Sequence, residues 1–541
     1  MTAVTVGYDE LVGLLGKSVT REEIEERLPM MGVAFDGWDG DSLVLDVFAN
    51  HPDWYSVEGL ARSLRGFLGI ETGLQGYAVK PSGVDFVVEK GVERVRPFAV
   101  GGIVRGLALG DALLRSVIDL QEKLHTTIGR KRKKVAIGIH DADKVTPPFT
   151  YRAVDPHAVK FVPLGMDREL DLAQVLAEHE KGREYAAALA GAEVYPVIQD
   201  ARGAVLSFPP IINGVVTQLT PETQDLFVDV TGTDRGSVEV VLNILVTALA
   251  DRGGVLESVR LVTPEGPRET PDLSPRPMTL DLAYAGGLTG IALTTKDVIA
   301  ALTRLRYDVT AKGGEVTALV PAYRADILHV VDVVEDIAVG YGYERIRPRL
   351  PAHATPGRPA PAQETAALLR TLLQGYGYQE VWTLPLVPRR EPFATEGRAA
   401  VRNPISDEVA LVRSALLPGL LNLLRANKHR DLPQRVFEVG AVVVGGANAL
   451  HAAAASVHAK AGFTEVKSLV QSLLRDLGRT WELAGADDTN YLPGRCAAVV
   501  VDGQERGRFG EVHPSVLAGY ELRHPVVAFE VDAVLGGSRE R

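Results

Sequence analysis

The sequence of 541 residues contains a single cysteine, Cys496. One thiol excludes an intramolecular disulfide and a thiolate metal cluster, which suits a reducing cytosol. The amino terminus lacks the basic start and apolar run of an export signal, and the apolar stretches are too short to span a bilayer. We therefore expect a cytoplasmic protein with no membrane segment.

Neither acidic nor basic residues strongly predominate in the sequence. Lys and Arg number 58 against 69 Asp and Glu, a net charge of −11, so any contact with nucleic acid must come from a local basic patch. Hydrophobic residues make up 46% and charged residues 23%, which argues against bulk disorder and a fibrous repeat. At roughly 150 residues per domain, the length predicts three or four domains.

Mixed strand and helix patterns predict a multidomain α+β protein. Proline-rich polar segments at 264–275 and 349–361 are interpreted as linkers. We expect four regions, with these boundaries: residues 1–90, 91–265, 276–348 and 360–541.

Two motifs of the second region have two interpretations each. Five consecutive cations at 130–134 follow a helix expected over 113–128. They could contact phosphates, or they could form a solvated helix end stabilised by the helix dipole. His140, Asp141 and Asp143 have the composition of a metal cluster, but acids in a turn more often cap backbone N–H groups, so a turn is predicted.

Two apolar segments of the same region, 204–213 and 226–234, end in polar and turn residues. Polar side chains at strand ends are a usual lining for a pocket on a rigid scaffold. The segments therefore indicate a possible binding site.

Carboxylates cluster in the third region. Asp332, Glu335 and Asp336 fall on one face of a helix, and Asp326 lies just ahead of it. Carboxylates are hard oxygen ligands, so Mg²⁺ or Ca²⁺ suits them and zinc does not. The alternative is that these acids form salt bridges with the arginines nearby, namely Arg324, Arg345 and Arg347.

Several motifs together strongly resemble the β-subunit family of phenylalanyl-tRNA synthetase, in its archaeal and eukaryotic form. They cover nearly the whole chain in the family's order: 208–213, 229–234, 324–343, 403–408, 413–421, 427–440, 491–495 and 510–514. One departure is His51, in Asn50-His-Pro-Asp-Trp, where the family usually has arginine.

The resemblance implies a heterotetramer of two α and two β chains that charges tRNA-Phe with phenylalanine, using ATP and Mg²⁺ at the α subunit. It implies an editing domain in the second region, a winged-helix-like magnesium-binding domain in the third, and a degenerate class II catalytic-like domain in the fourth. The magnesium ligands that it implies are Asp326, Asp332, Glu335 and Asp336.

The sequence of the fourth region agrees with a silent catalytic core. Class II chemistry needs arginines that hold the ATP phosphates, one of them typically in Phe-Arg-x-Glu. In Gln434-Arg-Val-Phe-Glu438 the acid is out of register, and the late Gly-Gly-Ser-Arg falls at 536–539, near the end of the sequence. We expect that this chain alone makes no phenylalanyl adenylate.

Proofreading is the chemistry that the resemblance implies for this chain. A pocket for a phenyl ring rejects tyrosine only weakly, so a second site that binds the hydroxyl must hydrolyse the mischarged ester. Asp229 could accept the phenolic proton, or it could instead cap the turn at 231–233. The residues that could position the ester and a water are Ser207, Asn213, Thr231 and Thr233. A positioned water is expected because no Ser-His-Asp or Cys-His set is evident nearby.

Two rival functions remain open at this point. The chain could be a non-catalytic RNA-binding scaffold, or a free-standing hydrolase that edits tRNA in trans. A stable complex with an α chain would support the synthetase, whereas deacylation by a monomer would support the free hydrolase.

Overall fold

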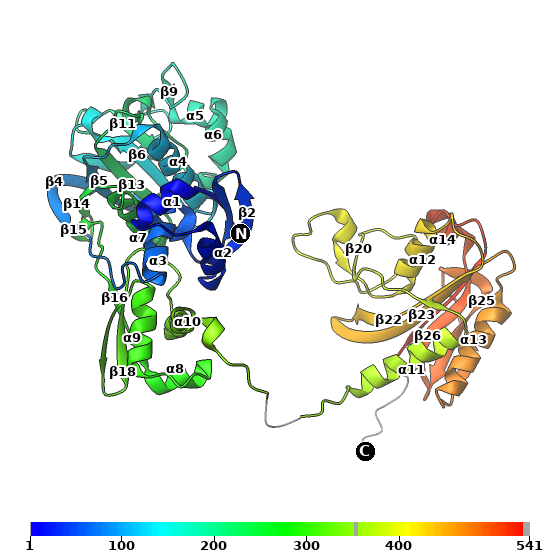
Figure 1. Cartoon of the computed structure of the whole chain (residues 1–541). Coiled ribbons are helices and arrows are strands. Elements are labelled where there is room, and N and C mark those ends of the chain that lie inside the picture. The colour runs from blue at the N-terminus through cyan, green and yellow to red at the C-terminus, as the bar shows by residue number, and fades with distance from the viewer. Residues whose placement is uncertain (1, 351–354, 534–541) are drawn as a thin grey trace. The chain divides into compact units, whose positions relative to one another are not determined.

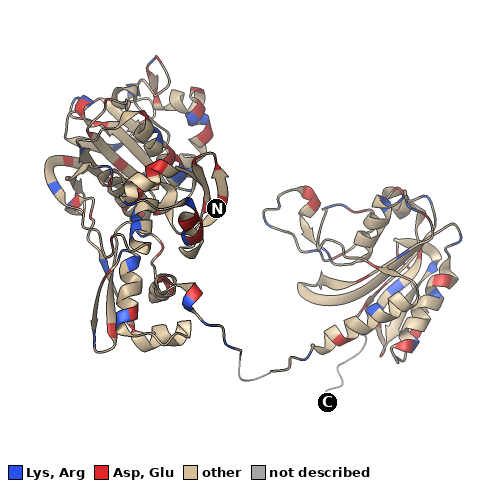
Figure 2. Ribbon diagram, viewed as in Figure 1, with Lys and Arg blue, Asp and Glu red and all other residues tan. Residues whose placement is uncertain are grey.

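The structure, a computed structural model, describes residues 2–350 and 355–533. It consists of two compact units, Met1–Arg349 and Leu350–Arg541 (Figure 1). Within each unit, acidic and basic residues are interspersed along the helices and loops (Figure 2). Among the described residues, no helix combines the length and apolar character needed to cross a bilayer.

The first region is a small antiparallel sheet with three helices. The strand order is β1-β3-β2. Backbone N–H groups of Glu23 and Gly59 donate to the side chains of Thr20 and Ser56, which therefore cap α2 and α3. The bounds are β1 (Thr2–Gly7), α1 (Tyr8–Leu15), α2 (Arg21–Met30), β2 (Ala34–Asp39), β3 (Ser42–Val47) and α3 (Val57–Phe67).

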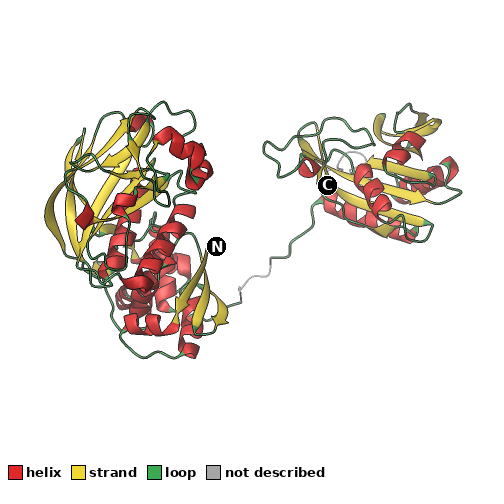
Figure 3. Ribbon diagram, turned by 90° about the horizontal axis from the view of Figure 1, so that it is seen from above, coloured by secondary structure: helices red, strands yellow, loops and turns green. Residues whose placement is uncertain are grey.

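A ten-stranded sheet forms the centre of the first unit, with helices packed beside it (Figure 3). Its order is β12-β11-β10-β7-β4-β14-β5-β13-β6, and β15 pairs with β14. The strands are β4 (Val79–Val88), β5 (Phe98–Arg105), β6 (Val135–Asp141), β7 (Phe149–Val154), β10 (Tyr195–Gln199), β11 (Val205–Phe208), β12 (Ile212–Asn213), β13 (Leu226–Gly232), β14 (Val255–Thr263) and β15 (Gly266–Thr270). The region also contains α4 (Gly110–Thr126), β8 (Lys160–Phe161), β9 (Leu170–Asp171), α5 (Leu172–Glu178), α6 (Glu180–Tyr185) and α7 (Arg235–Ala250).

Strands β6 and β13 are buried along their whole length. Strands that are buried on both faces are usually continuous apolar runs, so the polar residues within these two strands need another explanation. In the register, Asp229 of β13 lies opposite Gly138 of β6 and opposite Gly101 of β5. A glycine therefore lies opposite Asp229 on each side, and Gly138 leaves room for the carboxylate, since a Cβ atom there would lie 2.0 Å from Oδ2.

The third region is a three-stranded antiparallel sheet, ordered β16-β18-β17, with three helices. The bounds are β16 (Arg276–Asp281), α8 (Leu282–Thr289), α9 (Thr295–Arg304), β17 (Asp308–Lys312), β18 (Glu315–Val320) and α10 (Val330–Tyr341).

The segment 264–275 was predicted to be a linker, and this prediction is wrong in part. Residues Gly266–Thr270 form β15, which makes an antiparallel pair with β14 from Val259 to Thr263. Proline and charge dominate its composition, whereas the pairing depends on the neighbouring strand.

The second unit is built on a seven-stranded sheet with the order β19-β22-β23-β27-β26-β25-β24. Its strands are β19 (Gln379–Glu380), β22 (Gln434–Val444), β23 (Ala447–Val457), β24 (Glu482–Gly485), β25 (Tyr491–Val501), β26 (Gln504–Val512) and β27 (Val526–Asp532). A separate pair is formed by β20 (Leu386–Val387) and β21 (Leu411–Val412), and the helices are α11 (Pro361–Gly375), α12 (Leu417–Ala426), α13 (Phe463–Asp476) and α14 (Pro514–Gly519).

Helices cover both faces of this sheet. Ala452 and Ala454 of β23 belong to the core that includes α11 and α13, whereas Ala453 and Ala455 belong to the core that includes α12 and α14. Because side chains alternate along a strand, a run of four small residues lets helices approach from both sides.

Candidate active site

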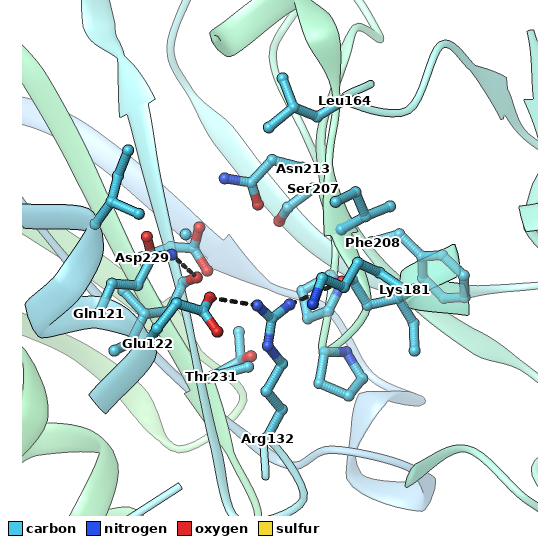
Figure 4. Close-up of a pocket in the computed structure, with 18 residues that line it drawn as sticks. Gln121, Glu122, Arg132, Leu164, Lys181, Ser207, Phe208, Asn213, Asp229 and Thr231 are labelled. Carbon is cyan, nitrogen blue, oxygen red and sulfur yellow. Dashed lines mark hydrogen bonds and ion pairs between the residues drawn. The ribbon is translucent and has the colours of Figure 1, made fainter. Parts of the chain in front are cut away.

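A cavity of about 250 Å³ lies in the second region, between β6, β11, β12, β13 and α4. Figure 4 shows polar side chains from these elements converging on it. Four of the five residues predicted for the editing site line this cavity: Ser207, Asn213, Asp229 and Thr231. Its apolar wall includes Ile118, Ile137, Leu164, Phe208 and Ile211.

Asp229 is 1% exposed, and its Oδ2 lies 2.7 Å from Nε2 of His140, which is fully buried. Its carboxylate therefore contacts a neighbouring strand, and the interpretation of Asp229 as a cap for the turn at 231–233 is wrong. The predicted turn after His140 is confirmed, because Asp141 accepts a hydrogen bond from the backbone N–H of Asp143.

Ser207 and Asn213 face each other across the paired strands β11 and β12. The buried Oγ of Ser207 has no hydrogen-bond partner among the described residues. An unpaired buried hydroxyl has a free-energy cost that a ligand could offset. Ser207 is therefore available to bind a group in the cavity.

Thr233, the fifth predicted residue, lies outside the cavity. It follows the last residue of β13, is exposed, and donates its backbone N–H to the carbonyl of Lys134. Thr231 is buried two residues earlier. The strand ends between them, so the Thr-Gly-Thr motif contributes one threonine to the cavity.

The basic run at 130–134 contributes one side chain to the site. Arg130, Lys131 and Arg132 have φ of 50°, 53° and 63°, a left-handed region that non-glycine residues seldom adopt. Arg132 is buried, and its Nη2 lies 2.6 Å from Glu122 in the cavity wall. Since α4 ends at Thr126, the run is not the last turn of that helix, and the helix-end interpretation is wrong. Contact of the run with phosphates stays a prediction.

Arg96 connects two walls of the cavity from behind. It donates from Nε to Oγ1 of Thr231 at 2.9 Å, and from Nη1 to the carbonyls of Arg132 and Lys133. Burial lowers the pKa of Arg96 to about 10, so it stays protonated at neutral pH.

A hydrogen bond from His125, together with the charge of Arg132, lowers the pKa of Glu122 to about 2. Burial lowers the pKa of His125 to about 4. At neutral pH the cavity wall therefore holds an ionised Glu122 paired with Arg132, next to a neutral imidazole.

The sequence did not predict four of the polar residues in or next to this cavity as part of the editing site: His140, Arg132, Glu122 and Arg96. His140 and Asp229 are 89 residues apart, so strand pairing brings them together and no local spacing indicates it. The one available signal was His140 itself, a polar residue that directly follows the apolar run 135–139.

The four predicted magnesium ligands do not meet at one point. Arg324 lies between Asp326 and Asp336, with its Nε 2.8 Å from Asp326 and its Nη2 2.8 Å from Asp336. Although burial alone would raise it, the charge of Arg324 holds the pKa of Asp326 below its ordinary value. The salt-bridge alternative therefore describes these two acids.

The other two acids have different environments. Asp332 accepts the backbone N–H groups of Leu328 and His329 at the start of α10, and Glu335 is exposed. Within residues 2–350 and 355–533, no group of three or more His, Cys, Asp or Glu side chains is placed to hold a metal ion. As folded here, the residues do not fit the predicted Mg²⁺ ion, because a guanidinium neutralises two of its four ligands.

Buried charges in the second unit are satisfied by protein groups. Glu438 pairs with Arg413 at 2.7 Å and accepts the hydroxyl of Thr383. Glu530 contacts His451 and accepts the N–H group of Leu416 before α12. Arg435 of the predicted degenerate motif is exposed, and the motif at 536–539 lies outside the described residues.

Three family models match the chain in succession. They are described as the B3/4 domain at residues 107–241, the tRNA synthetase B5 domain at 278–343, and the phenylalanyl tRNA synthetase beta chain CLM domain at 346–533. The B3/4 range contains four of the cavity residues, Ser207, Asn213, Asp229 and Thr231. These domains define a protein of the aminoacyl-tRNA synthetase class.

Similarity to curated proteins extends over the whole length. The phenylalanine–tRNA ligase beta subunit of Archaeoglobus fulgidus is 45% identical, with 98% of each chain covered. That of Methanothrix thermoacetophila is 43% identical, over 99% of this chain and all of the relative. A crystal structure of an N-terminal fragment of the phenylalanyl-tRNA synthetase beta subunit from Pyrococcus horikoshii matches with a TM-score of 0.61 and 40% identity, covering 63% of this chain and 99% of the fragment.

The chain belongs to the family of phenylalanine–tRNA ligase beta subunits. It is accordingly a ligase subunit of an aminoacyl-tRNA synthetase.

Proposed function

We propose that the chain works with an α chain, as a heterotetramer of two α and two β chains, to attach phenylalanine to tRNA-Phe with ATP and Mg²⁺ at the α chain. We propose further that its cavity hydrolyses mischarged Tyr-tRNA-Phe. Membership of the family supports the first statement. The observation that carries the second is the carboxylate of Asp229, buried in a cavity with an apolar wall.

The size of the cavity suits a single side chain. At about 250 Å³ it is smaller than the roughly 300–1,000 Å³ of typical small-molecule pockets. Apolar walls can take an aromatic ring, and Asp229 can accept a hydrogen bond from a phenol. This combination favours tyrosine over phenylalanine, because phenylalanine has no hydroxyl to donate to the second oxygen of the buried carboxylate.

The proposed reaction is hydrolysis by a positioned water. Water attacks the ester carbonyl carbon, the bond from that carbon to the ribose oxygen breaks, and the products are tyrosine and tRNA with a free hydroxyl. Ser207 Oγ and Arg132 Nε are buried without hydrogen-bond partners among the described residues. The hydroxyl can position the ester or the water, and the cation can stabilise negative charge on the carbonyl oxygen.

Replacement of Asp229 tests this function. In the enzyme assembled with its α chain, Asp229→Ala should slow hydrolysis of Tyr-tRNA-Phe roughly 10- to 100-fold, the value of a lost hydrogen bond to a charged group. Charging with phenylalanine should be unchanged. The measurement is deacylation of purified Tyr-tRNA-Phe.

Thr233→Ala is a matched control, since Thr233 follows the same strand but is exposed. It should deacylate at the normal rate. Unchanged deacylation by Asp229→Ala would remove Asp229 from the site. A wild-type enzyme that never releases tyrosine would reject the proofreading function.

The second unit is proposed to be catalytically silent for synthesis. The internal pairing of Glu438 with Arg413, and of Glu530 with His451 and α12, supports this, since these groups already have protein partners. The isolated chain should show no adenylate-dependent pyrophosphate exchange.

A group of exposed apolar residues in the second unit is the proposed surface for the α chain. Trp382 is 91% exposed, Leu384 73% and Ile405 99%. Large apolar side chains that gather in one exposed patch are typical of interaction sites, and we propose that these three residues form such a patch. The variant Trp382→Ser/Ile405→Asp should not co-purify with the α chain, whereas Lys467→Glu, an exposed change on α13, should. Normal assembly of the double variant would place the α chain elsewhere.

A magnesium ion at Asp326, Asp332, Glu335 and Asp336 stays a proposal for the assembled enzyme. It requires Arg324 to leave Asp326 and Asp336 first. The winged-helix-like assignment of the third region is likewise a proposal, supported by its three helices and three-stranded sheet.

A further inference from the structure

His140 holds one oxygen of Asp229 in a fixed place. The two residues are on the neighbouring strands β6 and β13, and Nε2 of His140 lies 2.7 Å from Oδ2 of Asp229. Gly138 precedes His140 by two residues on the same face of β6. A Cβ atom at Gly138 would lie 2.0 Å from Oδ2, so the carboxylate lies directly over the glycine.

The other nitrogen of His140 is also engaged. Nδ1 lies 2.9 Å from Oγ1 of Thr217, in the turn Val215–Thr217. A neutral imidazole has one donor and one acceptor nitrogen. If the Thr217 hydroxyl donates to Nδ1, then Nε2–H donates to Oδ2 of an ionised Asp229. If Thr217 instead donates to the carbonyl of Gly214 at 3.2 Å, then Nδ1–H donates to Thr217, and the contact between Nε2 and Oδ2 needs one further proton, carried either by the carboxyl group or by the ring.

In both arrangements Oδ2 is engaged by the imidazole and Oδ1 is left for the cavity. The histidine ring is itself held, since it stacks on Phe227 with centroids 5.9 Å apart and an interplanar angle of 25°. Asp229 lines the cavity, whereas His140 lies behind it and is not part of the lining. His140 therefore does not touch a ligand directly.

We propose that His140 is a positioning residue, which fixes the carboxylate of Asp229 so that Oδ1 faces the cavity and thereby sets the preference for esters that carry a phenolic hydroxyl. This inference rests on the proposed proofreading function. Without His140 the carboxylate can rotate, and the hydroxyl loses an acceptor of defined direction.

The test compares two esters in the enzyme assembled with its α chain. We measure kcat and KM for hydrolysis of Tyr-tRNA-Phe and of Phe-tRNA-Phe by wild type, His140→Leu and His140→Gln. His140→Leu should lower the Tyr/Phe ratio of kcat/KM about 10-fold, mainly through the tyrosyl ester. His140→Gln should keep the ratio within about threefold, because its amide N–H can donate to Oδ2.

A merely structural role for His140 would change both esters equally and would not be rescued by glutamine. Either that pattern or an unchanged ratio in His140→Leu overturns the proposal. If His140→Leu fails to fold, Thr217→Val decides the question: it should lower the ratio in the same direction, and an unchanged ratio overturns the proposal.

Failure of the proposed function is distinguishable from failure of this inference. A wild-type enzyme that hydrolyses neither ester rejects the proofreading function. In another outcome, the wild-type enzyme hydrolyses Tyr-tRNA-Phe and Asp229→Ala does not, but the Tyr/Phe ratio of kcat/KM is the same with and without His140. That outcome rejects only the role of His140.

Discussion

His125 is a buried residue whose protonation opposes folding. Its Nε2 accepts the backbone N–H of Ile137 at 2.8 Å, and this bond is lost when Nε2 takes up a proton. Burial lowers the pKa to about 4, whereas the unfolded chain titrates at about 6.5. The unfolded state therefore binds a proton that the folded state does not, and stability falls as the pH drops from about 6.5 to about 4.

We predict a loss of roughly 3 kcal/mol over that range, from a pKa difference of about 2.5. Denaturant unfolding of the full-length chain at pH 7 and pH 4.5 measures most of it. The variant His125→Gln should show a weaker pH dependence across the same interval. An identical pH dependence in the variant would contradict the assignment.

Some residues of the candidate active site were predictable from the sequence, and others were not. Ser207 and Asp229 belong to the two apolar segments whose polar ends indicated a binding site, the family resemblance singled them out, and both line the cavity. The inward position of Arg132 was not predictable, because it is one of five consecutive cations and the left-handed backbone at 130–132 directs its side chain inward. Thr233 was included wrongly, since the end of a strand cannot be located to one residue from sequence.

Among the elements, the pairing of β6 with β13 determines the site. Gly138 is opposite Asp229, and any side chain there would meet the carboxylate and the ring of His140. We predict that Gly138→Ala displaces Asp229 and lowers hydrolysis of Tyr-tRNA-Phe at least 10-fold, by loss of a directed hydrogen bond.

Gly236→Ala is the matched control for this change. Nothing lies within 4 Å of a Cβ atom at Gly236, which is at the start of α7. It should leave deacylation unchanged. Normal deacylation by Gly138→Ala would show that the strand register does not constrain the carboxylate.

Helices were more predictable than strand pairing. The helix expected over 113–128 corresponds to α4, Gly110–Thr126, within a few residues at each end. The segment 264–275 was misread because its composition resembles a linker. Its strand β15 pairs with β14, which directly precedes it in the sequence, and the composition of 264–275 does not reveal this pairing.

On the scale of the whole molecule, Arg62 joins three regions of the first unit. From α3 its Nη1 lies 2.9 Å from Asp251 and 2.8 Å from the hydroxyl of Tyr77. Its guanidinium carbon lies 3.8 Å from the ring centroid of Tyr323. The first, second and third predicted regions therefore share one buried cation, which helps to explain why they form a single compact unit.

Removal of this cation should destabilise the unit strongly. Arg62→Met leaves Asp251 without its charged partner, and breaking a buried pair costs about 3–5 kcal/mol. Arg65→Met, on the same helix, removes a half-exposed pair with Glu71 and should cost less than about 1 kcal/mol. Calorimetric melting of the full-length chain compares them, and equal melting temperatures would contradict the role of Arg62.

The division into Met1–Arg349 and Leu350–Arg541 also has an evolutionary consequence. Every cavity residue belongs to the first unit, and the exposed apolar residues Trp382, Leu384 and Ile405 belong to the second. Under the functions proposed for these two sets of residues, mutations that change fidelity and mutations that change subunit recognition fall in different units. A hybrid gene joined near residue 350 would inherit its accuracy from one parent and its choice of companion chain from the other.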